Sequence, residues 1–568
     1  MTQVKTPHNK DTNLIAGCLF MNEFTMSRSQ RRALTLFCFL ILGLSALFLR
    51  IFLVATGEDL QTVAKNQSSY TLTVDQSRGM IYDCNFKPLV NSTEQYVLSV
   101  LPCDEAAQAL MQSVPYGERE KLLKLFDGGR PFLYEFDSPY IYAQGINVFT
   151  VKQRYSENQP AVHVIGHLDG EGAGVYGIEK AYDALLAANS GKLTVTYAVD
   201  ALRRPLTNVS PEITRTNYNN REGVVLTIDS DIQQIAEQEG ARLIKKGAVL
   251  VMEAATGKIR AAASFPAFDP NNVAASLDDS DSPLVNRCFS AYNVGSTFKL
   301  SGVAAALEKD IPLDYTYTCT GSIEVNGIKF YCHNRAGHGE IGLDEAMQRS
   351  CNPYFINLAM QTGYDKLYEM AVRFGFGKAN NLTEVTRSAA GNLPDMESLR
   401  NNAVLANFAF GQGELTATPI QIARMICVFA NGGTLVTPTL VEGISDKAGQ
   451  EIASPYEPSP SYRMLSSANA DTIRQLMINV VNTGSGKKAK PTKGGAGGKT
   501  GSAQTGIYDE NDEEIVHAWF SGFFPADNPK YVVVVLNEGM DSGGDWSAPV
   551  FREIADRIEN LEARRAEQ

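Results

Sequence analysis

A long apolar segment near the N-terminus constrains this chain more than any other feature of its sequence. Residues 33–49 contain no charged side chain, and after Arg50 the apolar character continues to about position 56. A helix over 33–56 would be about 36 Å long, enough to cross the roughly 30 Å hydrocarbon core of a bilayer with some tilt. We therefore expect a transmembrane helix at 33–56, with the bulk of the chain on one side of the membrane.

The charges that precede this segment predict its orientation. Residues 1–32 contain five lysines and arginines and two acidic side chains, and positive charge beside a membrane helix favours the cytoplasmic side. We expect 1–32 in the cytoplasm, 33–56 as an uncleaved signal anchor, and the remaining residues outside. A cleaved signal peptide is the alternative, but the leader is long and no clear small-residue cleavage site follows it.

Composition narrows the class of protein further. The chain has 568 residues, 44% hydrophobic and 20% charged, which indicates folded protein of two or three domains. Its formal net charge of −12 argues against a nucleic-acid partner, because nucleic acids are bound by basic surfaces. No cysteine quartet with zinc-module spacing is present in the sequence.

The part beyond the membrane divides into two regions. Residues 60–225 alternate short β-like runs with turns, which predicts a β-rich domain. From 226 to 568 buried strands come first, several helices follow, and apolar strands return near the end. Strands from both ends of this region would share one mainly antiparallel sheet flanked by helices, so we expect an α/β or α+β fold. The expected strands are 247–253, 258–264, 518–524 and 531–537, and the last helix covers about 549–563.

The motif STFK at 296–299 sets a hydroxyl and an amine three residues apart. The apolar stretch after it has helical spacing, and residues three apart on a helix share a face, so Ser296 and Lys299 should point the same way. Gly295 suits a tight turn into the helix. Taken alone, the motif is also typical of a capping serine beside a solvated lysine.

Two further motifs follow STFK in a fixed order. SCN begins at Ser350, 54 residues after Ser296, and KTG begins at Lys499, a further 149 residues on. Other copies of S-x-x-K and S-x-N lack this order or a helix start; they lie at 485–488, 156–158 and 467–469. The ordered set S-x-x-K, S-x-N and K-T-G matches the serine acyltransferase motifs of penicillin-binding proteins and class A β-lactamases.

At this point the chain resembles a known family, the class B penicillin-binding proteins. SRGMIYDCNFKPL at 77–89 and GVYGIEKAYDALL at 174–186 are similar to blocks of the family's pedestal domain. GAVLVMEAATGKIRAAASFPAFDPN, GQGELTATPIQIA and GKTGSAQT resemble blocks of its transpeptidase domain. The resemblance implies a pedestal at 60–225 and a penicillin-binding transpeptidase domain at 226–568. This sequence departs from the common pattern at Cys351, inside S-x-N, and at Ser502, where threonine is usual.

The resemblance implies a peptidoglycan D,D-transpeptidase that works through an acyl-enzyme on Ser296. An alcohol needs a base within reach, and Lys299 suits that role if burial and the charge of Lys499 lower its pKa. Ser350 could relay the proton to the leaving amine, and Asn352 could orient Lys299 or the substrate. The reaction releases D-alanine, needs no metal or organic cofactor, and is blocked covalently by β-lactams.

The KTG strand is expected to bind the donor peptide. Hydroxyls of Thr500 and Ser502 suit the terminal carboxylate of a D-Ala-D-Ala stem peptide, while Gly501 leaves room for the substrate. By resemblance the oxyanion hole consists of the backbone N–H groups of Ser296 and Ser502. The implied partners are an acceptor amine on a second stem peptide and a polytopic membrane glycosyltransferase of the shape, elongation, division and sporulation family. The expected location is the plasma membrane of a bacterium.

Two other functions remain open on the same motifs. One is a hydrolase, either a D,D-carboxypeptidase or a β-lactamase, and the other is a non-catalytic β-lactam sensor or scaffold. A class A β-lactamase needs a glutamate that activates water, and no E-x-x-L-N element lies between Asn352 and Lys499. The nearest acidic loop, GQGEL at 411–415, instead resembles a transpeptidase block.

A group of cysteines and histidines between 319 and 338 allows two alternatives. Cys319, Cys332, His333 and His338 could hold zinc, although their spacing matches no usual zinc module. A Cys319–Cys332 disulfide is the other possibility in an outward-facing domain. VNGI at 325–328 predicts a type I′ hairpin turn, whose register would place Cys319 opposite Asn334 rather than Cys332. A separate lysine group, at 487, 488, 490 and 493, is expected to form a solvated loop.

Overall fold

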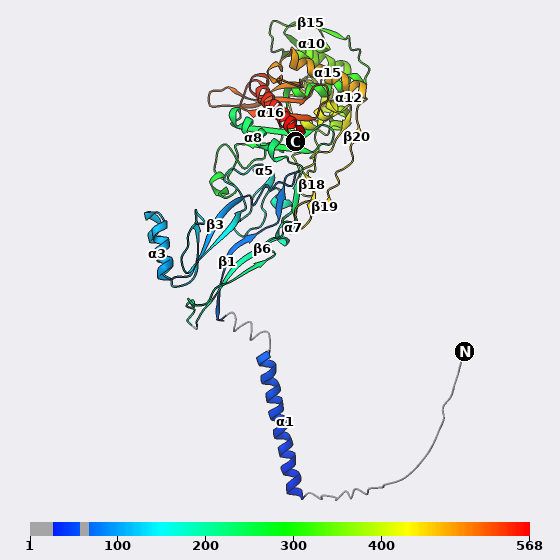
Figure 1. Cartoon of the computed structure of the whole chain (residues 1–568). Helices are drawn as coiled ribbons and strands as arrows, with labels where there is room; N and C mark the ends of the chain where they lie inside the picture. The colour runs from blue at the N-terminus through cyan, green and yellow to red at the C-terminus, as the bar shows by residue number, and fades with distance from the viewer. Residues whose placement is uncertain (1–26, 57–66, 201, 568) are drawn as a thin grey trace, which may run out of the picture. The chain divides into compact units, whose positions relative to one another are not determined.

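The computed structural model describes residues 27–56, 67–200 and 202–567 (Figure 1). Helix α1 (Arg28–Thr56) begins five residues before the predicted segment and ends where predicted. In these described parts of the chain, α1 is the helix that is long and apolar enough to cross a membrane. At its start, the backbone N–H of Ser27 donates to Gln30 Oε1 at 3.0 Å, and the backbone N–H of Gln30 donates to Ser27 Oγ at 3.3 Å. Lys5 and Lys10, part of the predicted orientation signal, lie outside the described residues.

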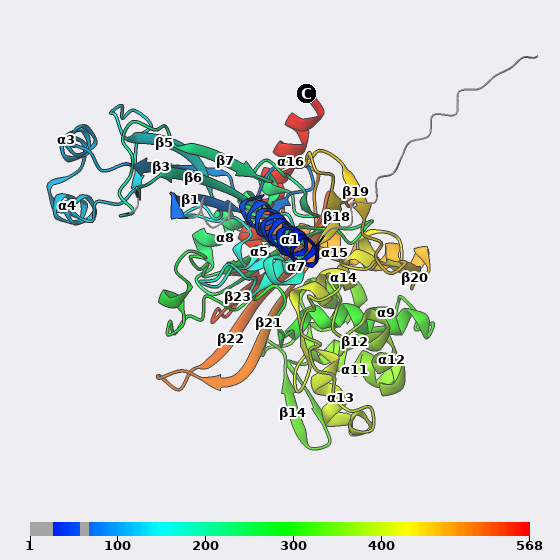
Figure 2. The same cartoon turned by 90° about the horizontal axis from the view of Figure 1, so that it is seen from below.

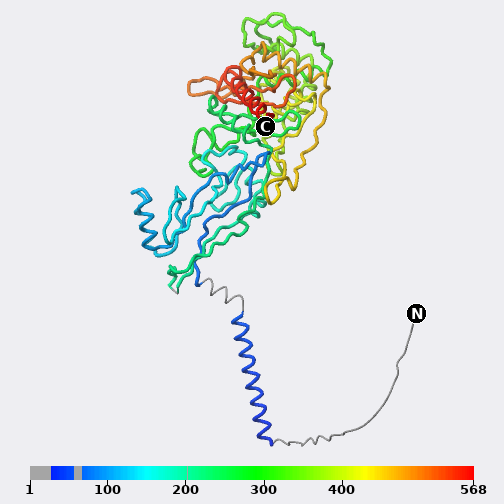
Figure 3. Tube along the Cα trace, viewed as in Figure 1, coloured from blue at the N-terminus to red at the C-terminus, as the bar shows by residue number. Residues whose placement is uncertain are grey.

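One antiparallel sheet organises the region after residue 226, as the sequence predicted. The strands are β10 (Ile259–Phe265), β9 (Gly247–Glu253), β23 (Tyr531–Glu538), β22 (Glu514–Phe524) and β21 (Gly497–Tyr508), in that spatial order. Figure 3 traces the chain through this region, in which β9 pairs with β23 although the two strands come from its opposite ends. Figure 2 shows β21 and β22 extending outward as a long hairpin. The predicted α/β architecture is therefore confirmed.

Alternate residues of the sheet pack into two different cores. On one face, Val533 and Val535 of β23 pack with α8 (Ser230–Leu243) and α16 (Ala548–Glu567). On the other face, Val532 and Val534 belong to the core of the helical part. Side chains alternate across a strand, so the apolar run YVVVVLN serves both cores. The helices on this second side are α9 (Lys299–Glu308), α11 (Asn352–Thr362), α12 (Tyr364–Phe374), α13 (Asn402–Ala409), α14 (Pro419–Ala430) and α15 (Ser467–Asn482).

Short elements lie between these helices. A small excursion after α9 contains β12 (Thr316–Cys319), β13 (Ser322–Val325), β14 (Ile328–Tyr331) and β15 (Gly339–Gly342), followed by α10 (Leu343–Gln348). Asn326 and Gly327 have φ of 53° and 77°, which confirms the predicted type I′ turn. The remaining short elements are η2 (Val273–Ser276), β11 (Tyr292–Asn293), η4 (Ser398–Arg400), β16 (Thr416–Ala417), β17 (Thr434–Leu435), β20 (Tyr462–Arg463), η5 (Lys487–Ala489) and η6 (Gly543–Ser547).

The region before residue 226 is rich in strands. One sheet has the order β1 (Ser69–Ser77), β6 (Gly191–Ala198) and β7 (Glu212–Thr216); another has β4 (Phe132–Phe136), β3 (Thr93–Val100) and β5 (Ile146–Gln153). A third contains β2 (Met80–Tyr82), β8 (Gly223–Leu226), β18 (Val441–Ser445) and β19 (Ile452–Pro455). The helices of the region before residue 226 are α3 (Asp104–Ser113), η1 (Tyr116–Glu118), α4 (Arg119–Asp127), α5 (Val162–Ile165), α6 (Gly177–Ala181) and α7 (Asp183–Ala188).

Residues 71–196 and 212–567 form one compact unit, so the predicted boundary at 225/226 falls inside it. Within this unit, Glu179 is fully buried between Arg78 at 3.0 Å and Arg154 at 2.7 Å. Arg78 also pairs with Asp183 at 2.6 Å. The two sequence blocks that resemble a pedestal domain, 77–89 and 174–186, are therefore joined by the buried Arg78–Glu179 ion pair and by the partly exposed Arg78–Asp183 pair.

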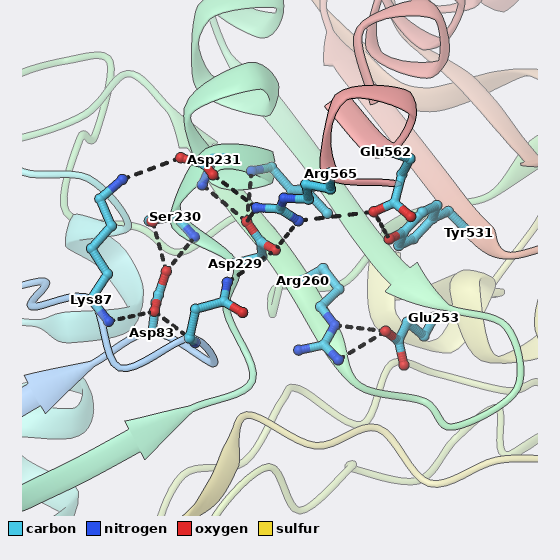
Figure 4. Close-up of polar contacts among 12 residues, drawn as sticks. Asp83, Lys87, Asp229, Ser230, Asp231, Glu253, Arg260, Tyr531, Glu562 and Arg565 are labelled. Atoms are coloured by element: carbon cyan, nitrogen blue, oxygen red, sulfur yellow. Dashed lines mark hydrogen bonds and ion pairs between the residues drawn. The ribbon is translucent and has the colours of Figure 1, made fainter. Parts of the chain in front are cut away.

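A second polar network joins three distant pieces of the same unit (Figure 4). Asp83, in the turn after β2, accepts hydrogen bonds from the backbone N–H of Ser230 at 3.1 Å and its hydroxyl at 2.7 Å. Asp229 caps the start of α8 by accepting from two backbone N–H groups. Arg565, near the end of α16, donates to Asp229 at 2.7 and 3.0 Å and to Asp231 at 2.8 Å. The start of α8 is thus held from both sides.

Candidate active site

The serine and lysine of STFK lie on consecutive turns. Ser296 is on the short 3-10 turn η3 (Gly295–Phe298), and Lys299 begins α9. The predicted helical turn therefore starts as a 3-10 turn and continues as an α-helix. Gly295 has φ of 62°, and a Cβ at this position would lie 2.7 Å from the carbonyl oxygen of Ser502. Glycine is therefore required here both by a left-handed backbone and by the close approach of β21.

The amine of Lys299 is completely buried and surrounded by acceptors from the SCN motif. Its Nζ donates to the carbonyl oxygen of Ser350 at 2.8 Å, to Ser350 Oγ at 3.1 Å and to Asn352 Oδ1 at 2.7 Å. It also lies 5.3 Å from the ring centre of Phe355. The Nδ2 of Asn352 donates in turn to the carbonyl oxygen of Tyr331 at 3.1 Å, which fixes the amide orientation.

Ser350 places its hydroxyl between two buried lysines. Lys499, in β21, donates its Nζ to Ser350 Oγ at 2.9 Å and to the carbonyl oxygen of Thr500 at 3.0 Å. Ser350 has φ of 49°, a left-handed conformation that is uncommon for serine. The chain therefore turns sharply at Ser350, between the end of α10 and the start of α11, and brings one hydroxyl within reach of both amines.

Burial controls the protonation of these lysines. It lowers the pKa of Lys299 to about 7. It also holds the pKa of Lys499 well below its usual value, and the charge of Lys299 lowers that pKa further. Two ammonium groups around one hydroxyl cannot both be charged at low cost. The motif pattern predicts that burial and the charge of Lys499 together lower the pKa of Lys299. In the structure burial is the main cause, and the charge repulsion lowers the pKa of Lys499 instead.

The hydroxyl groups of the three motifs open onto one cleft of about 530 Å³. Ser296, Ser350, Asn352, Thr500 and Ser502 line it, so the structure brings together residues that the sequence predicted as one site. The other lining residues are His333, Arg349, Gly484, Ser485, Lys487, Lys488, Asp541, Ser542, Gly544 and Asp545.

Gly501 is buried in the KTG strand beside this cleft. A Cβ on Gly501 would lie 2.8 Å from Thr297 Oγ1 and 3.1 Å from the carbonyl oxygen of Val294. The space beside Gly501 is therefore taken by the turn that carries Ser296. The sequence pattern predicts that this space is left for substrate, and that prediction is wrong. In the structure, Gly501 instead allows β21 to pack closely against η3.

Ser485, Lys488 and Asp545 border the cleft but were not predicted. Ser485 Oγ lies 2.8 Å from Thr500 Oγ1, and Lys488 pairs with Asp545 at 2.6 Å. The lysine loop is exposed as predicted, but Lys487 and Lys488 also line the cleft. Because Lys488 binds Asp545, the second S-x-x-K copy at 485–488 does not form a serine–lysine pair in the structure. The only sequence signal was the position of this loop just before KTG.

Four side chains capable of binding metal meet directly beside the SCN motif. The sulfur atoms of Cys319, Cys332 and Cys351 and a ring nitrogen of His338 all lie within 4.8 Å of one another. The sequence analysis had grouped His333 with Cys319, Cys332 and His338; in the structure Cys351 takes the place of His333, which lines the cleft instead.

The cysteine register also differs from the prediction. The hairpin pairs Val325 with Ile328 as expected, but its ladder ends at Ser322. Beyond Gly321, which has φ of 93°, the chain changes partner, and Cys319 pairs with Gly339 of β15 rather than with Asn334. This break in the ladder allows Cys319 and Cys332 to approach each other. Both are free thiols in the structure.

Comparison with known proteins now places the chain. A family model described as the penicillin binding protein transpeptidase domain matches residues 247–556. Stage V sporulation protein D of Bacillus subtilis is 30% identical over 536 residues, covering 88% of this chain and 80% of that protein. Peptidoglycan D,D-transpeptidase PbpA of Mycobacterium tuberculosis is 33% identical over 358 residues, covering 58% of this chain and 70% of that protein.

Solved structures agree with the sequence comparison. A chain from a structure of a peptidoglycan synthase complex that coordinates polymerization and crosslinking superimposes with a TM-score of 0.64 at 25% identity. The match covers 92% of this chain and 97% of that one. The chain therefore belongs to the penicillin-binding protein transpeptidase family, as one of its class B members.

Proposed function

We propose that this protein is a peptidoglycan D,D-transpeptidase that cross-links stem peptides through an acyl-enzyme on Ser296. The observation that carries the proposal is the position of Ser350. Its Oγ lies 3.1 Å from the amine of Lys299 and 2.9 Å from that of Lys499, in the same cleft as Ser296. A hydroxyl between two buried amines is suited to proton transfer, whereas a scaffold has no need of such a group.

We propose that acylation uses these groups in the following order. Lys299, with its pKa lowered to about 7, is partly neutral at physiological pH and can accept the proton of Ser296. The Oγ of Ser296 forms a bond to the carbonyl carbon of the penultimate D-alanine, and the peptide C–N bond then breaks. Ser350 passes the proton to the departing amine of the terminal D-alanine. An amine of a second stem peptide then attacks the ester and releases Ser296.

The oxyanion hole is proposed to consist of the backbone N–H groups of Ser296 and Ser502. β21 is the outer strand of its sheet, so alternate residues direct their peptide groups away from β22. The close approach of the Ser502 carbonyl oxygen to Gly295 shows that Ser502 is such a residue. The N–H of a strand residue points to the same side as its own C=O, so the N–H of Ser502 also points towards the turn that holds Ser296.

The hydroxyls of Thr500 and Ser502 face the same cleft and suit the terminal carboxylate of the donor peptide.

The cleft also contains carboxylates, which could activate water if the protein were a hydrolase. Hydrogen bonds from Lys488 and then from Ser542 hold the pKa of Asp545 below its usual value, so this carboxylate is a weak base for water. This arrangement favours transfer to an amine over hydrolysis.

The membrane arrangement completes the proposal. We infer that α1 anchors the protein in the bacterial plasma membrane, with residues 1–32 in the cytoplasm and the catalytic domain outside. The proposed division is a pedestal at 60–225 and a transpeptidase domain at 226–568. Because a matched structure belongs to a peptidoglycan synthase complex, we propose that the partner is a polytopic membrane glycosyltransferase.

Labelling with a fluorescent penicillin tests the site. We expect a covalent adduct on wild-type protein and none on Ser296→Ala. Ser467→Ala, which removes the serine of another S-x-N copy, is the matched control and should label normally. Labelling that survives in Ser296→Ala would overturn the assignment of the nucleophile. A wild-type protein that never labels would favour the scaffold alternative.

The lifetime of that adduct separates transfer from hydrolysis. Because Lys488 and Ser542 already bind Asp545, we expect the Ser296 ester to persist for many minutes after unbound drug is removed. Intact-mass spectrometry follows the adduct directly. If it disappears within seconds while hydrolysed product accumulates over many turnovers, the protein is a hydrolase.

A further inference from the structure

Three cysteines and a histidine form a compact cluster beside the cleft. Cys319, Cys332 and Cys351 are buried, with at most 1% of each residue exposed, and His338 is partly buried. All four ligand atoms lie within 4.8 Å of one another, and the Sγ of Cys332 is 3.6 Å from Nδ1 of His338. They come from four separate segments: β12, the position after β14, the loop before β15 and the SCN motif. Such convergence of thiols is not needed by the proposed acyl transfer.

We infer that Cys319, Cys332, His338 and Cys351 bind one structural zinc ion. Three thiolates and one imidazole form a ligand set that zinc takes in closed tetrahedral sites. With Zn–S bonds of about 2.3 Å and Zn–N bonds of about 2.0 Å, neighbouring ligand atoms are roughly 3.5–3.8 Å apart. The cluster thus needs to close by about 1 Å at its widest, which side-chain rotation can supply.

The zinc would brace the active site rather than take part in the chemistry. Cys351 lies between Ser350 and Asn352, both of which hold the amine of Lys299. Cys332 follows Tyr331, whose carbonyl oxygen accepts from Asn352. A metal bound to Cys351 and Cys332 would therefore fix both sides of the Asn352 contact. This consequence rests on the proposed function, whereas the metal site itself does not.

A disulfide is the competing use of the same thiols. A Cys319–Cys332 or Cys332–Cys351 bridge would join two of the sulfur atoms and leave the third thiol and His338 without a shared partner. Zinc explains the convergence of all four side chains, and it keeps the three sulfur atoms reduced. The two alternatives differ in metal content and in mass, so both are measurable on the same sample.

The test measures zinc in the full-length protein, purified in detergent without reductant and without chelator. We expect about one zinc per chain in the wild type and in Cys84→Ser, which changes a cysteine outside the cluster. Cys332→Ser and His338→Ala should retain less than about a tenth of that zinc. His338→Cys should regain it, because a fourth thiolate is also a zinc ligand. Replacement by Co²⁺ should give the thiolate-to-cobalt charge-transfer absorption of a tetrahedral site.

A treatment of the wild-type protein covers the case in which the variants fail to fold. Removing zinc with a strong chelator should slow penicillin acylation by about 10-fold or more, and adding zinc should restore the rate. The site is excluded if the wild type holds no zinc and takes up no Co²⁺, if Cys332→Ser retains wild-type zinc, or if mass spectrometry finds a disulfide among these cysteines. If the wild-type protein binds zinc but is never acylated by penicillin, the proposed function fails while the metal site stands.

Discussion

At the scale of single residues, the two buried lysines set the chemistry of the cleft. Lys299 and Lys499 reach the same hydroxyl from different elements, and neither is exposed to solvent. Desolvation disfavours the charged form of an amine, which makes a lysine available as a base near neutral pH. The site therefore depends on exclusion of water as much as on the identity of its residues.

The pH dependence of acylation tests this role of Lys299. The neutral amine accepts the proton, and the pKa of Lys299 is lowered to about 7. Acylation by penicillin should therefore be slow below this pH, rise by about tenfold per pH unit, and level off above it. Lys299→Arg stays charged and should be at least about 10²-fold slower, with no such rise. Lys309→Arg, an exposed lysine at the end of the same helix, should behave like the wild type; a flat profile for the wild type would contradict the role.

Gly295 tests the contact between the serine turn and β21. Alanine at Gly295 meets the Ser502 carbonyl oxygen at 2.7 Å, and it also strains a left-handed backbone. Gly506→Ala is the matched control, because Gly506 has φ of 71° but no neighbouring atom within 4 Å of a new Cβ. Gly295→Ala should lower the acylation rate by about 10²-fold through displacement of the oxyanion donors. Gly506→Ala should change it less than about twofold; equal losses in both variants would mean that strain alone matters.

At the scale of elements, the site is assembled where secondary structures meet. Ser296 lies on the turn η3 just before α9, Ser350 lies just before α11, and Lys499 lies on the outer strand of the sheet. Each motif comes from the end of a helix or from the edge of the sheet, where backbone groups are left over for binding. The small excursion β12–β15 then covers the SCN motif and carries three of the four proposed zinc ligands.

Helix α8 is stabilised by contacts from outside its own segment. Arg565→Ala removes the ion pairs to Asp229 and Asp231, and Asp229 is nearly buried. Because Arg565 is about one-third exposed, solvent screens part of the interaction, and we expect the free energy of unfolding to fall by about 1–2 kcal/mol. Arg564→Ala is the control, since the described residues show no ion pair for Arg564. Chemical denaturation measures both; equal values would show that the pairs contribute nothing.

At the scale of the whole molecule, the anchor and the catalytic unit are separate parts. α1 has no charged side chain from residue 33 to residue 49, while residues 71–196 and 212–567 form a compact unit with cores of their own. The proposed arrangement is a single-pass protein with its catalytic domain outside the membrane.

Removal of residues 1–56 tests this separation. The shortened protein should move from the membrane fraction to the soluble fraction, because α1 is the described helix able to span a bilayer. It should still form the penicillin adduct at a rate within about twofold of the full-length protein, since the motif residues and the cores around them lie outside the deleted part. Fractionation followed by fluorescent labelling measures both. Retention of the shortened protein on washed membranes would reveal a second membrane contact.

Local pattern was sufficient for the elements and for the main site. The apolar runs at 247–253 and 531–537 are strands, VNGI is a type I′ turn, and the charge-free segment is a helix. STFK, SCN and KTG, in that order, contain four residues that line one cleft, and Ser502, the residue after KTG, lines it as well. These predictions succeed because periodicity, turn residues and motif order are properties of neighbouring positions in the chain.

Other features of the site depend on packing between segments that are far apart in the sequence, and only the tertiary structure determines them. Cys351 joined Cys319, Cys332 and His338 because the β13–β14 ladder ends at Ser322 and the chain changes partner, which no local pattern indicates. Lys488 lines the cleft because its loop lies against η6, where it meets Asp545. The pKa values of Lys299 and Lys499 likewise follow from burial, which exists only after folding. The sequence by itself therefore determined which groups carry the chemistry, and the packed structure determined their surroundings.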